Sequence, residues 1–302
     1  MQIPLITVGI PSYNHAKFLT KCLNSVVNQT YPNLEVIVVD NYSTDGTDDI
    51  LSGFSDHRIS VIKVNNGGSI AMSRNTILNK SRGEWIAFLD SDDWWKEDKL
   101  EKCAHNFQPG IDLIYHDLII VDESTDRSQS MSIKSRILEE PVFKDLIIKG
   151  NTIATSSVVV RNTILSKVNG MNESKEMFGI EDFNTWLKIS QITEGFKHIP
   201  ENLGFYRMHN NNASLAKKFI RPSAAFIEFL PLLSKKEISA MNNNYDFAAA
   251  RLNFIAKNGN TSKKDLVSLI KHGRLKNRIN AFYMLLVSVL NMRKNNLTTL
   301  LD

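Results

Sequence analysis

Three carboxylates lie within four residues in the run Asp90-Ser91-Asp92-Asp93, directly after an apolar segment. Carboxylates this close together repel one another unless a cation or solvent relieves their charge. Hard oxygen ligands at the end of a strand suit Mg²⁺ or Mn²⁺, which commonly bind a few carboxylates together with the phosphates of a substrate. The alternative interpretation is a solvated acidic turn that caps the next helix.

Two indole side chains, Trp94 and Trp95, follow the acidic run at once. Aromatic faces beside a polar site can pack on sugar rings, and packing in the core is an equally good interpretation for one of the two. The pair favours a binding site over a capping turn.

Polar side chains also follow two other apolar segments. The run Pro11–Asn14 comes after the first of them, and Asp40 comes at the end of the second. Ser12 and Asp45 are expected to cap helices, because single polar residues at such positions are most often cap or turn residues. The terminal-strand position of Asp40 favours a ligand role instead.

These side chains need a sheet whose strands end at one edge. Four short apolar segments, rich in β-branched residues, are typical of parallel strands buried on both faces: Leu5–Ile10, Leu34–Val39, Ile59–Val64 and Trp85–Leu89. Helical patterns alternate with them at His15–Asn28, Thr47–Phe54 and Ser69–Lys80. This alternation predicts an α/β fold with a mostly parallel sheet flanked by helices, whose ligands bind beyond the carboxyl ends of the strands.

The rest of the chain suggests two domains. Further strands are expected at Asp112–Val121, Ser156–Val160 and Phe196–Tyr206, and an amphipathic helix at Asp182–Ile192. Residues 122–135 are polar and indicate a loop or hairpin, and the pattern is helical from Arg221 onward. We expect a ligand-binding α/β domain over residues 1–212 and a helical region over residues 213–302.

Composition excludes several classes of protein. The 302 residues are 42% hydrophobic and 23% charged, which excludes disorder, collagen and coiled coil. No apolar run reaches the roughly 18–20 residues of a membrane-spanning helix, and the first residues are interpreted as a strand rather than a signal peptide. Two cysteines without a CxxC motif favour a reducing, cytoplasmic location. The motifs GxGxxG, GxxxxGK[ST] and GxSxG are absent, which disfavours hydride transfer, P-loop hydrolysis and α/β-hydrolase chemistry.

Charge is distributed unevenly along the chain. Residues 213–302 contain 15 Lys and Arg against 5 Asp and Glu, a net charge of +10, whereas residues 1–212 contain 21 against 27, a net charge of −6. The acidic part could hold cations, and the basic part could meet phosphate, lipid head groups or nucleic acid. A lysine-rich helical surface that faces water explains the basic part equally well.

Four blocks, in order, resemble the family 2 glycosyltransferases, which have the GT-A fold, and bacterial polysaccharide and O-antigen enzymes in particular. Residues 11–47, PSYNHAKFLTKCLNSVVNQTYPNLEVIVVDNYSTDGT, resemble the opening block, and residues 65–95, NNGGSIAMSRNTILNKSRGEWIAFLDSDDWW, the second. Gly179–Asp182 is similar to the acidic ED block and Tyr206–His209 to the YRxH block. The resemblance covers residues 5–210. One departure is Asn41-Tyr42, where Asp-Gly is the commonest pattern.

The resemblance implies a role for each matching residue on the donor side. Pro11 and Tyr13 would line the nucleoside pocket, and Asp40 would accept a hydrogen bond from the uracil base. Arg74 would lie near the donor. Asp90 would contact the ribose or the donor sugar, and Ser91 is counted among the donor-binding residues.

The resemblance also implies the metal site and the catalytic base. Asp92 and His209 would hold Mn²⁺ or Mg²⁺, with Arg207 near the phosphates, and Asp182 would be the general base, beside Glu181. Taken alone, His209 would more often be an exposed loop histidine, and the acidic pair would more often favour a helix dipole. The ordered set of blocks favours the catalytic interpretation.

The expected activity is therefore inverting, metal-dependent transfer of a sugar from a UDP-sugar to a glycan, carried on undecaprenyl diphosphate at the inner face of a bacterial membrane. No nucleic-acid partner is expected. The basic tail, with the apolar stretch Ala281–Leu290, could lie in the membrane interface, or Phe282, Leu285, Leu286 and Val289 could pack on the catalytic domain. A nucleotidyltransferase and a catalytically inactive glycan-assembly protein are the alternatives.

Overall fold

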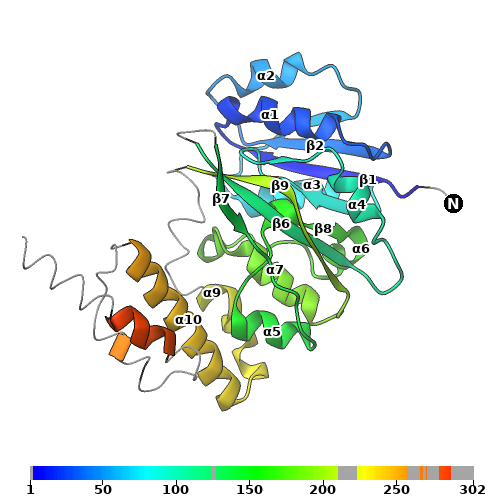
Figure 1. The fold of residues 1–302 in the computed structure, drawn as a ribbon. Coiled ribbons are helices and arrows are strands. Elements are labelled where there is room, and N and C mark those ends of the chain that lie inside the picture. The colour runs from blue at the N-terminus through cyan, green and yellow to red at the C-terminus, as the bar shows by residue number, and fades with distance from the viewer. Residues whose placement is uncertain are drawn as a thin grey trace, which may run out of the picture. The chain divides into compact units, whose positions relative to one another are not determined.

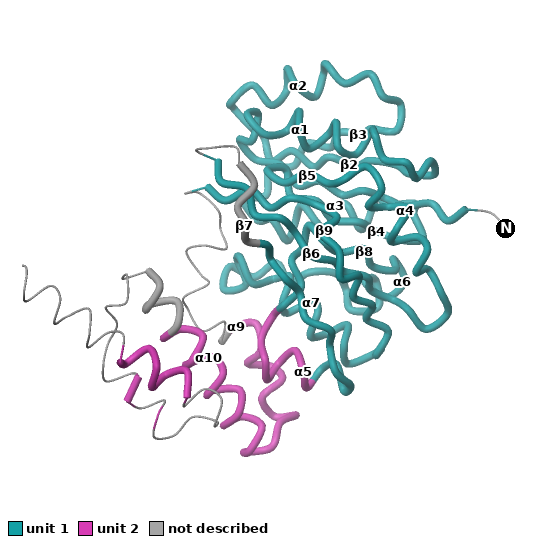
Figure 2. Tube along the Cα trace, in the orientation of Figure 1, with its two compact units in different colours: residues 1–143, 152–212 teal, residues 144–151, 213–302 magenta. Residues whose placement is uncertain are grey.

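The computed structural model describes residues 3–123, 127–209, 223–256, 266–267, 270 and 279–286. The chain divides into two compact units (Figure 2). Unit 1 contains residues 1–143 and 152–212, and unit 2 contains residues 144–151 and 213–302. Each unit has its own apolar cluster.

Unit 1 is built on a mixed sheet of nine strands in the order β3-β2-β1-β4-β8-β6-β9-β5, with β7 paired to β6 (Figure 1). The strands are β1 (Ile6–Ser12), β2 (Leu34–Asp40), β3 (Ile59–Lys63), β4 (Trp85–Phe88), β5 (Trp94–Trp95), β6 (Leu113–Asp122), β7 (Arg127–Ile133), β8 (Val159–Arg161) and β9 (Phe196–Met208).

The first half of the sheet is parallel, as the sequence predicts. Strand β1 pairs with β2 and β4, and β2 pairs with β3, all in parallel. Every residue of β1, β2 and β4 is buried. Helices α1 (Ala16–Val27), α2 (Thr47–Gly53) and α3 (Ile70–Lys80) connect these strands. The expected α/β fold is confirmed.

The second half of the sheet is largely antiparallel, which the segment patterns do not predict. Strand β8 is antiparallel to β4 and to β6, and β9 runs parallel to β6. The far end of β9 then pairs with the two-residue strand β5, where Trp94 lies opposite Phe205 and Trp95 opposite Gly204. Because β5 directly follows the acidic run, this pairing brings the end of β9 to that run.

The remaining helices are short apart from α10. In unit 1 they are α4 (Lys99–Ala104), η1 (Thr155–Ser157), α6 (Asn162–Lys167), η2 (Lys175–Met177) and α7 (Glu181–Ser190), and α5 (Val142–Lys149) leads from unit 1 into unit 2. Unit 2 continues with α9 (Ser223–Phe226), η3 (Ile227–Leu232) and α10 (Lys235–Ala256). Residues 279–286 are also helical. No helix among the described residues is both long and apolar enough to cross a membrane.

Gly83 sits where two central strands leave no room for a side chain. A Cβ atom there would lie 2.5 Å from the backbone nitrogen of Thr7 in β1 and 2.7 Å from the carbonyl oxygen of Trp85 in β4. Backbone atoms in a sheet cannot move away independently, so any larger residue would push the strands apart.

We therefore expect Gly83→Ala to lower the free energy of unfolding by about 1–3 kcal/mol, the usual effect of overpacking. Gly53→Ala is the matched control, because nothing lies within 4 Å of its Cβ position in α2. This change should be neutral or stabilise the protein by up to about 1 kcal/mol. Urea denaturation of the three proteins measures both effects, and an equal result for the two variants would contradict the packing argument.

Candidate active site

The acidic run follows β4 at the edge where β1, β2 and β4 end, and its three carboxylates have different partners. Asp90 forms an ion pair with Arg74, Oδ1 to Nη2, at 2.6 Å. Asp92 Oδ2 lies 2.8 Å from Nε2 of His209. Asp93 is buried and accepts a hydrogen bond from the backbone nitrogen of Arg207. Burial and the charges of Asp92 and Asp90 raise the pKa of Asp93 well above its usual range, which favours its uncharged acid form.

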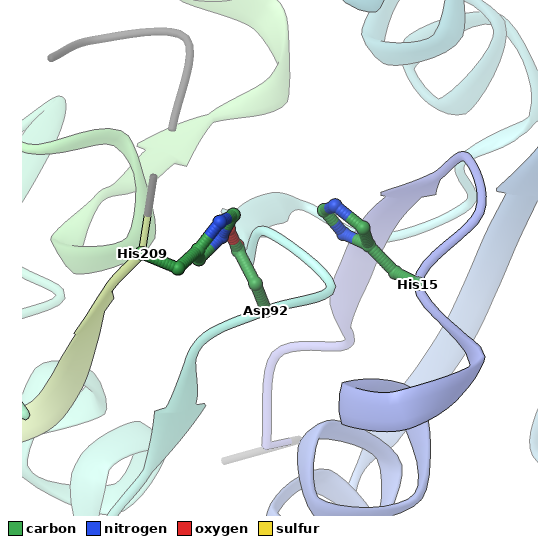
Figure 3. A group of neighbouring side chains, drawn as sticks. All are labelled: His15, Asp92 and His209. Atoms are coloured by element: carbon green, nitrogen blue, oxygen red, sulfur yellow. The ribbon is translucent and has the colours of Figure 1, made fainter. Parts of the chain in front are cut away.

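Asp92 and His209 belong to a cluster with a third residue, His15. One ligand atom from each side chain lies within 4.8 Å of the other two, and Figure 3 shows Asp92 between the two imidazole rings. Two imidazoles and one carboxylate suit a divalent transition-metal ion. The structure thus brings together the two residues expected to hold the metal. It adds His15, which the sequence analysis missed because its place after the first strand gives no sign of the distant Asp92.

Arg74 lies at the centre of a buried network. Its side chain is only 3% exposed, with Nη2 bonded to Asp90 and Nη1 bonded to Glu181 Oε1 at 2.8 Å. Burial lowers the pKa of Arg74, but the adjacent Asp90 and Glu181 outweigh it and raise that pKa above its usual value. Glu181 also accepts a hydrogen bond from the backbone nitrogen of Gly179. Arg74 and Glu181 thus neutralise one another and fix the position of Asp90.

Asp182 lies in the first turn of α7, which the buried Phe183 and Trp186 anchor to the core. Its Oδ2 accepts a hydrogen bond from Thr155 at 3.0 Å, and its Oδ1 accepts one from the backbone of Phe183. Burial and the charge of Glu181 raise the pKa of Asp182 to about 6, although Arg74 acts in the opposite direction. A carboxyl group with this pKa can accept a proton near neutral pH.

The short helix η1 connects Asp182 to the acidic run. Thr155 donates its hydroxyl hydrogen bond to Asp182, and the neighbouring Ser156 accepts one from the backbone nitrogen of Asp90 at 3.1 Å. Two consecutive residues of η1 therefore connect Asp90, which follows β4, to the first turn of α7.

The nucleoside-side residues lie on two loops that brace each other. Tyr13 is 53% exposed, whereas Pro11 and Asp40 are buried. Asp40 accepts hydrogen bonds from the hydroxyl of Ser43 at 2.5 Å and from its backbone nitrogen at 3.1 Å. The backbone nitrogen of Asn14, in the loop after β1, donates a hydrogen bond to the same Ser43 hydroxyl and so connects this loop to the one after β2. Asp40 thus organises its own loop from the end of β2.

Two capping predictions have opposite outcomes. Asp45 accepts hydrogen bonds from the backbone of Ala16 at the start of α1 and from Thr47 at the start of α2, which confirms its capping role. The Ser12 hydroxyl is buried and has no hydrogen-bond partner among the described residues, so the prediction that it caps a helix is wrong.

The aromatic pair after the acidic run belongs to the core. Trp95 is buried and donates its indole hydrogen to the carbonyl of Ser156. Trp94 is also buried, stacks on Phe205 and faces the Arg207 guanidinium at 4.7 Å. The interpretation of these indoles as a platform for a sugar ring is therefore wrong.

Arg207 is largely buried at the same place. Its guanidinium lies over the rings of Phe18 and Trp94, and its Nε donates a hydrogen bond to the carbonyl of Asp92 at 3.2 Å. Arg207 therefore supports the acidic run at Asp92.

Comparison with known proteins gives a consistent result. A model of the family described as glycosyl transferase family 2 matches residues 7–167, just over half of the chain. Glycosyltransferase GlyG of Streptococcus pneumoniae is 36% identical over 263 residues, which cover 83% of this chain and 85% of GlyG. WfaP of Escherichia coli, a UDP-Glc:alpha-D-GlcNAc-diphosphoundecaprenol beta-1,3-glucosyltransferase, is 31% identical over 219 residues, 71% of this chain and 81% of WfaP.

Solved structures share the fold. Staphylococcus aureus TarS 1-349, in complex with UDP-GlcNAc, superposes with a TM-score of 0.59 at 20% identity, over 91% of this chain and 79% of TarS 1-349. The mannosyltransferase PcManGT from Pyrobaculum calidifontis, in complex with GDP-Man and Mn²⁺, superposes with a TM-score of 0.60 at 18% identity, over 96% of this chain and 87% of PcManGT. The family match and the two relatives, together with the GT-A architecture, establish that this chain belongs to glycosyl transferase family 2 and is a glycosyltransferase.

Proposed function

We propose that this glycosyltransferase moves a sugar from a UDP-sugar to a glycan hydroxyl with inversion, using a divalent metal ion. The observation that carries the proposal is the arrangement at the end of β4. Asp92 bonds to His209, and Asp182 is tied to the backbone of Asp90 through Thr155 and Ser156. The proposed metal site and the proposed base would thereby be held by the same short segment.

Asp92 and His209 would hold the metal ion, which would act as a Lewis acid toward the diphosphate leaving group. The donor set fits such an ion, because carboxylate oxygen and imidazole nitrogen both ligate Mn²⁺ and similar ions. Arg74 and Glu181 neutralise one another and hold Asp90, which leaves the exposed part of Asp90 available to a donor hydroxyl. Ser91 lies between Asp90 and Asp92 and would line the same surface.

The nucleoside would bind beside the loops that follow β1 and β2. Tyr13 would offer its exposed ring, Pro11 would line the pocket, and the fully buried Asp40 would shape it by holding Ser43 in the loop after β2. The uridine assignment is supported by the donor named for WfaP and by the UDP-GlcNAc in the TarS complex. PcManGT was solved with GDP-Man, so a guanine nucleotide is the competing donor to include in any screen.

Asp182 would remove the proton from the acceptor hydroxyl as that oxygen attacks the anomeric carbon. The raised pKa of Asp182 makes this carboxylate a stronger base than an ordinary aspartate. Glu181 cannot do the same work easily, because Arg74 and the backbone of Gly179 occupy its oxygens. We therefore assign Asp182 as the base and Glu181 as the neighbour whose charge raises the pKa of that base.

The acceptor would be a lipid-linked glycan of a bacterial surface polysaccharide. The name of WfaP specifies a diphosphoundecaprenol acceptor, and the two proteins share 31% of aligned residues. Such an acceptor stays at the membrane, so the enzyme has to reach the cytoplasmic face of the bilayer.

Unit 2 offers a surface for that contact. In the helical residues 279–286, Ala281 and Met284 are buried in the apolar cluster of unit 2, whereas Ile279, Phe282, Tyr283 and Leu286 are exposed. Their spacing of three, four and seven residues places the exposed apolar side chains on one face. With the net charge of +10 in residues 213–302, this face is typical of a helix that lies in an anionic membrane interface. Val289 and the flanking basic residues lie outside the described residues.

The metal prediction concerns Asp92→Asn and His209→Ala. Either change removes a ligand and should weaken Mn²⁺-dependent UDP binding at least about 10-fold, since even residues behind a ligand commonly contribute that much. EDTA should abolish transfer by the wild-type enzyme, and Mn²⁺ should restore it. Asp49→Asn, an exposed aspartate of α2, is the control and should change nothing. Full transfer in EDTA by metal-free enzyme would contradict the proposal.

The base prediction concerns Asp182→Asn, which keeps the shape and removes the basicity. We expect kcat to fall by roughly 10²–10⁴-fold with little change in UDP binding. The activity of the wild type depends on the ionised form, so kcat/KM at saturating Mn²⁺ should rise with pH, reach half of its maximum near pH 6 and level off at higher pH.

Thr155→Val also tests the assignment of Asp182 as the base, because it keeps the carboxylate and changes its pKa. Its hydroxyl stabilises the charged form of Asp182, so removing it should raise the pKa of Asp182 and move the acidic limb of the pH profile to higher pH. An unmoved limb, or near wild-type turnover by Asp182→Asn, would show that another group is the base.

The membrane prediction uses sedimentation with vesicles. The full chain should pellet with vesicles that contain phosphatidylglycerol, remain in the supernatant with pure phosphatidylcholine, and be released from the anionic vesicles at high salt. The double variant Phe282→Ser, Leu286→Ser should lose most of the binding. Ile137→Ser, at an exposed apolar residue of unit 1, is the control. Equal recovery of the wild type with both kinds of vesicle at low salt would contradict membrane attachment through this face.

A further inference from the structure

We propose that His15 is a third protein ligand of the metal ion, and that the resulting set of two imidazoles and one carboxylate binds Mn²⁺ in preference to Mg²⁺ before any nucleotide is present. The inference rests on the proposed function only in that the same ion serves the donor diphosphate. The sequence analysis and the family blocks assign the metal to Asp92 and His209 alone.

The three side chains come from distant parts of unit 1 and meet at one point. His15 lies between β1 and α1, Asp92 follows β4, and His209 follows β9 (Figure 3). Their ligand atoms all lie within 4.8 Å of one another. Metal–nitrogen bonds of about 2.0–2.1 Å place opposite ligands of one ion about 4 Å apart. Small rotations of the side chains are therefore enough to close the three atoms around one ion.

The ordinary explanation for a polar residue at this position does not account for His15. It occupies the N-cap position of α1, yet its side chain makes no capping hydrogen bond. The capping is done from elsewhere, since the backbone nitrogen of Ala16 donates to Asp45 Oδ2 at 2.9 Å. The imidazole instead turns toward the acidic run, where its Nδ1 lies 2.8 Å from the hydroxyl of Ser91.

That contact leaves the other ring nitrogen of His15, Nε2, for an ion. Histidines that bind metals commonly have their second nitrogen held by a hydrogen bond, which fixes both the tautomer and the ring orientation. Ser91 provides this hydrogen bond and is the immediate neighbour of Asp92, so it couples the first ligand to the second.

Phe18 fixes the two imidazole rings relative to each other. It stacks on His209 with ring centroids 5.4 Å apart and meets His15 edge-on at 5.7 Å. The His15 and His209 rings themselves are 6.1 Å apart and nearly perpendicular. One buried phenyl ring of α1 therefore holds both histidines at the site, and the two rings need little reorganisation to accept an ion.

The donor set determines which ion binds. Mg²⁺ prefers oxygen ligands and keeps much of its water, whereas imidazole nitrogen favours the first-row transition metals. A site that relied on Asp92 and substrate phosphates alone would suit Mg²⁺ equally well. Two imidazoles beside one carboxylate should instead make binding tighter for Mn²⁺ and Co²⁺, and should allow it without the phosphates of a nucleotide.

The test measures Mn²⁺ binding to metal-stripped full-length protein in the absence of nucleotide. Electron paramagnetic resonance reports free Mn²⁺ during the titration, and its pulsed form counts the nitrogen nuclei coupled to bound Mn²⁺. We expect two coupled imidazole nitrogens in the wild type. In His15→Ala, the Kd should rise at least about 10-fold and one coupling should disappear. His105→Ala, at an exposed histidine, should match the wild type.

A second variant keeps the test valid if His15→Ala is poorly folded. His15→Asp places a favoured N-cap residue at the start of α1 and replaces imidazole with carboxylate. It should retain Mn²⁺ binding with a single nitrogen coupling, and Mg²⁺ should compete more effectively than in the wild type. An unchanged ratio of Mg²⁺ to Mn²⁺ affinity in this variant would overturn the inference.

The outcomes separate this inference from the proposed function. If His15→Ala binds Mn²⁺ with wild-type affinity and both nitrogen couplings, the assignment of His15 fails while metal-dependent transfer through Asp92 and His209 stands. If the wild type binds Mn²⁺ only when UDP is present, the nucleotide-independent site is likewise excluded. Metal-free transfer in EDTA would overturn the proposed function itself.

Discussion

The site depends on how three neighbouring carboxylates at the end of β4 are kept from repelling one another. Each is relieved differently. Asp90 is paired with Arg74, Asp93 is buried with a raised pKa that favours its neutral form, and Asp92 faces His209. For Asp90 and Asp93, the repulsion is relieved without a metal ion. Asp92 and His209 offer a carboxylate oxygen and an imidazole nitrogen that face each other, an arrangement that a divalent cation can bridge.

This arrangement requires a strand from the second half of the sheet. Strand β9 pairs with β6 along its length, and its residues Gly204 and Phe205 pair on the other edge with β5. Because β5 begins immediately after Asp93, the turn between β4 and β5 is held against the end of β9. Arg207 lies over the rings of Phe18 and Trp94 and donates a hydrogen bond to the carbonyl of Asp92 in that turn. Trp94, which resembled a sugar platform, thus helps to support the turn that carries Asp92.

Much of the fold follows from local pattern, and much of the site does not. The strands β1, β2 and β4 are recognisable because they are buried on both faces and mostly apolar. The expectation that the segment at β3 is buried on both faces is wrong, because β3 is an edge strand with no fully buried residue. Asp90 and Asp92 are recognisable because three carboxylates lie within four residues. His15 could not be identified, since its partners are more than 70 residues away and only the folded sheet brings them together. Strand β5 is two residues long and has no periodicity of its own. The ion pairs of Arg74 depend equally on long-range packing, which no local spacing encodes.

The central claim is that the protein gathers its metal ligands at Asp92 and not elsewhere on the acidic run. Anomalous diffraction at the manganese edge, from crystals grown with Mn²⁺ and UDP, tests it most directly. We expect one anomalous peak within bonding distance of Asp92, His209 and His15, with Asp93 making no contact and Asp90 still paired with Arg74. A peak bonded to Asp90 or Asp93, with His209 turned away, would contradict it.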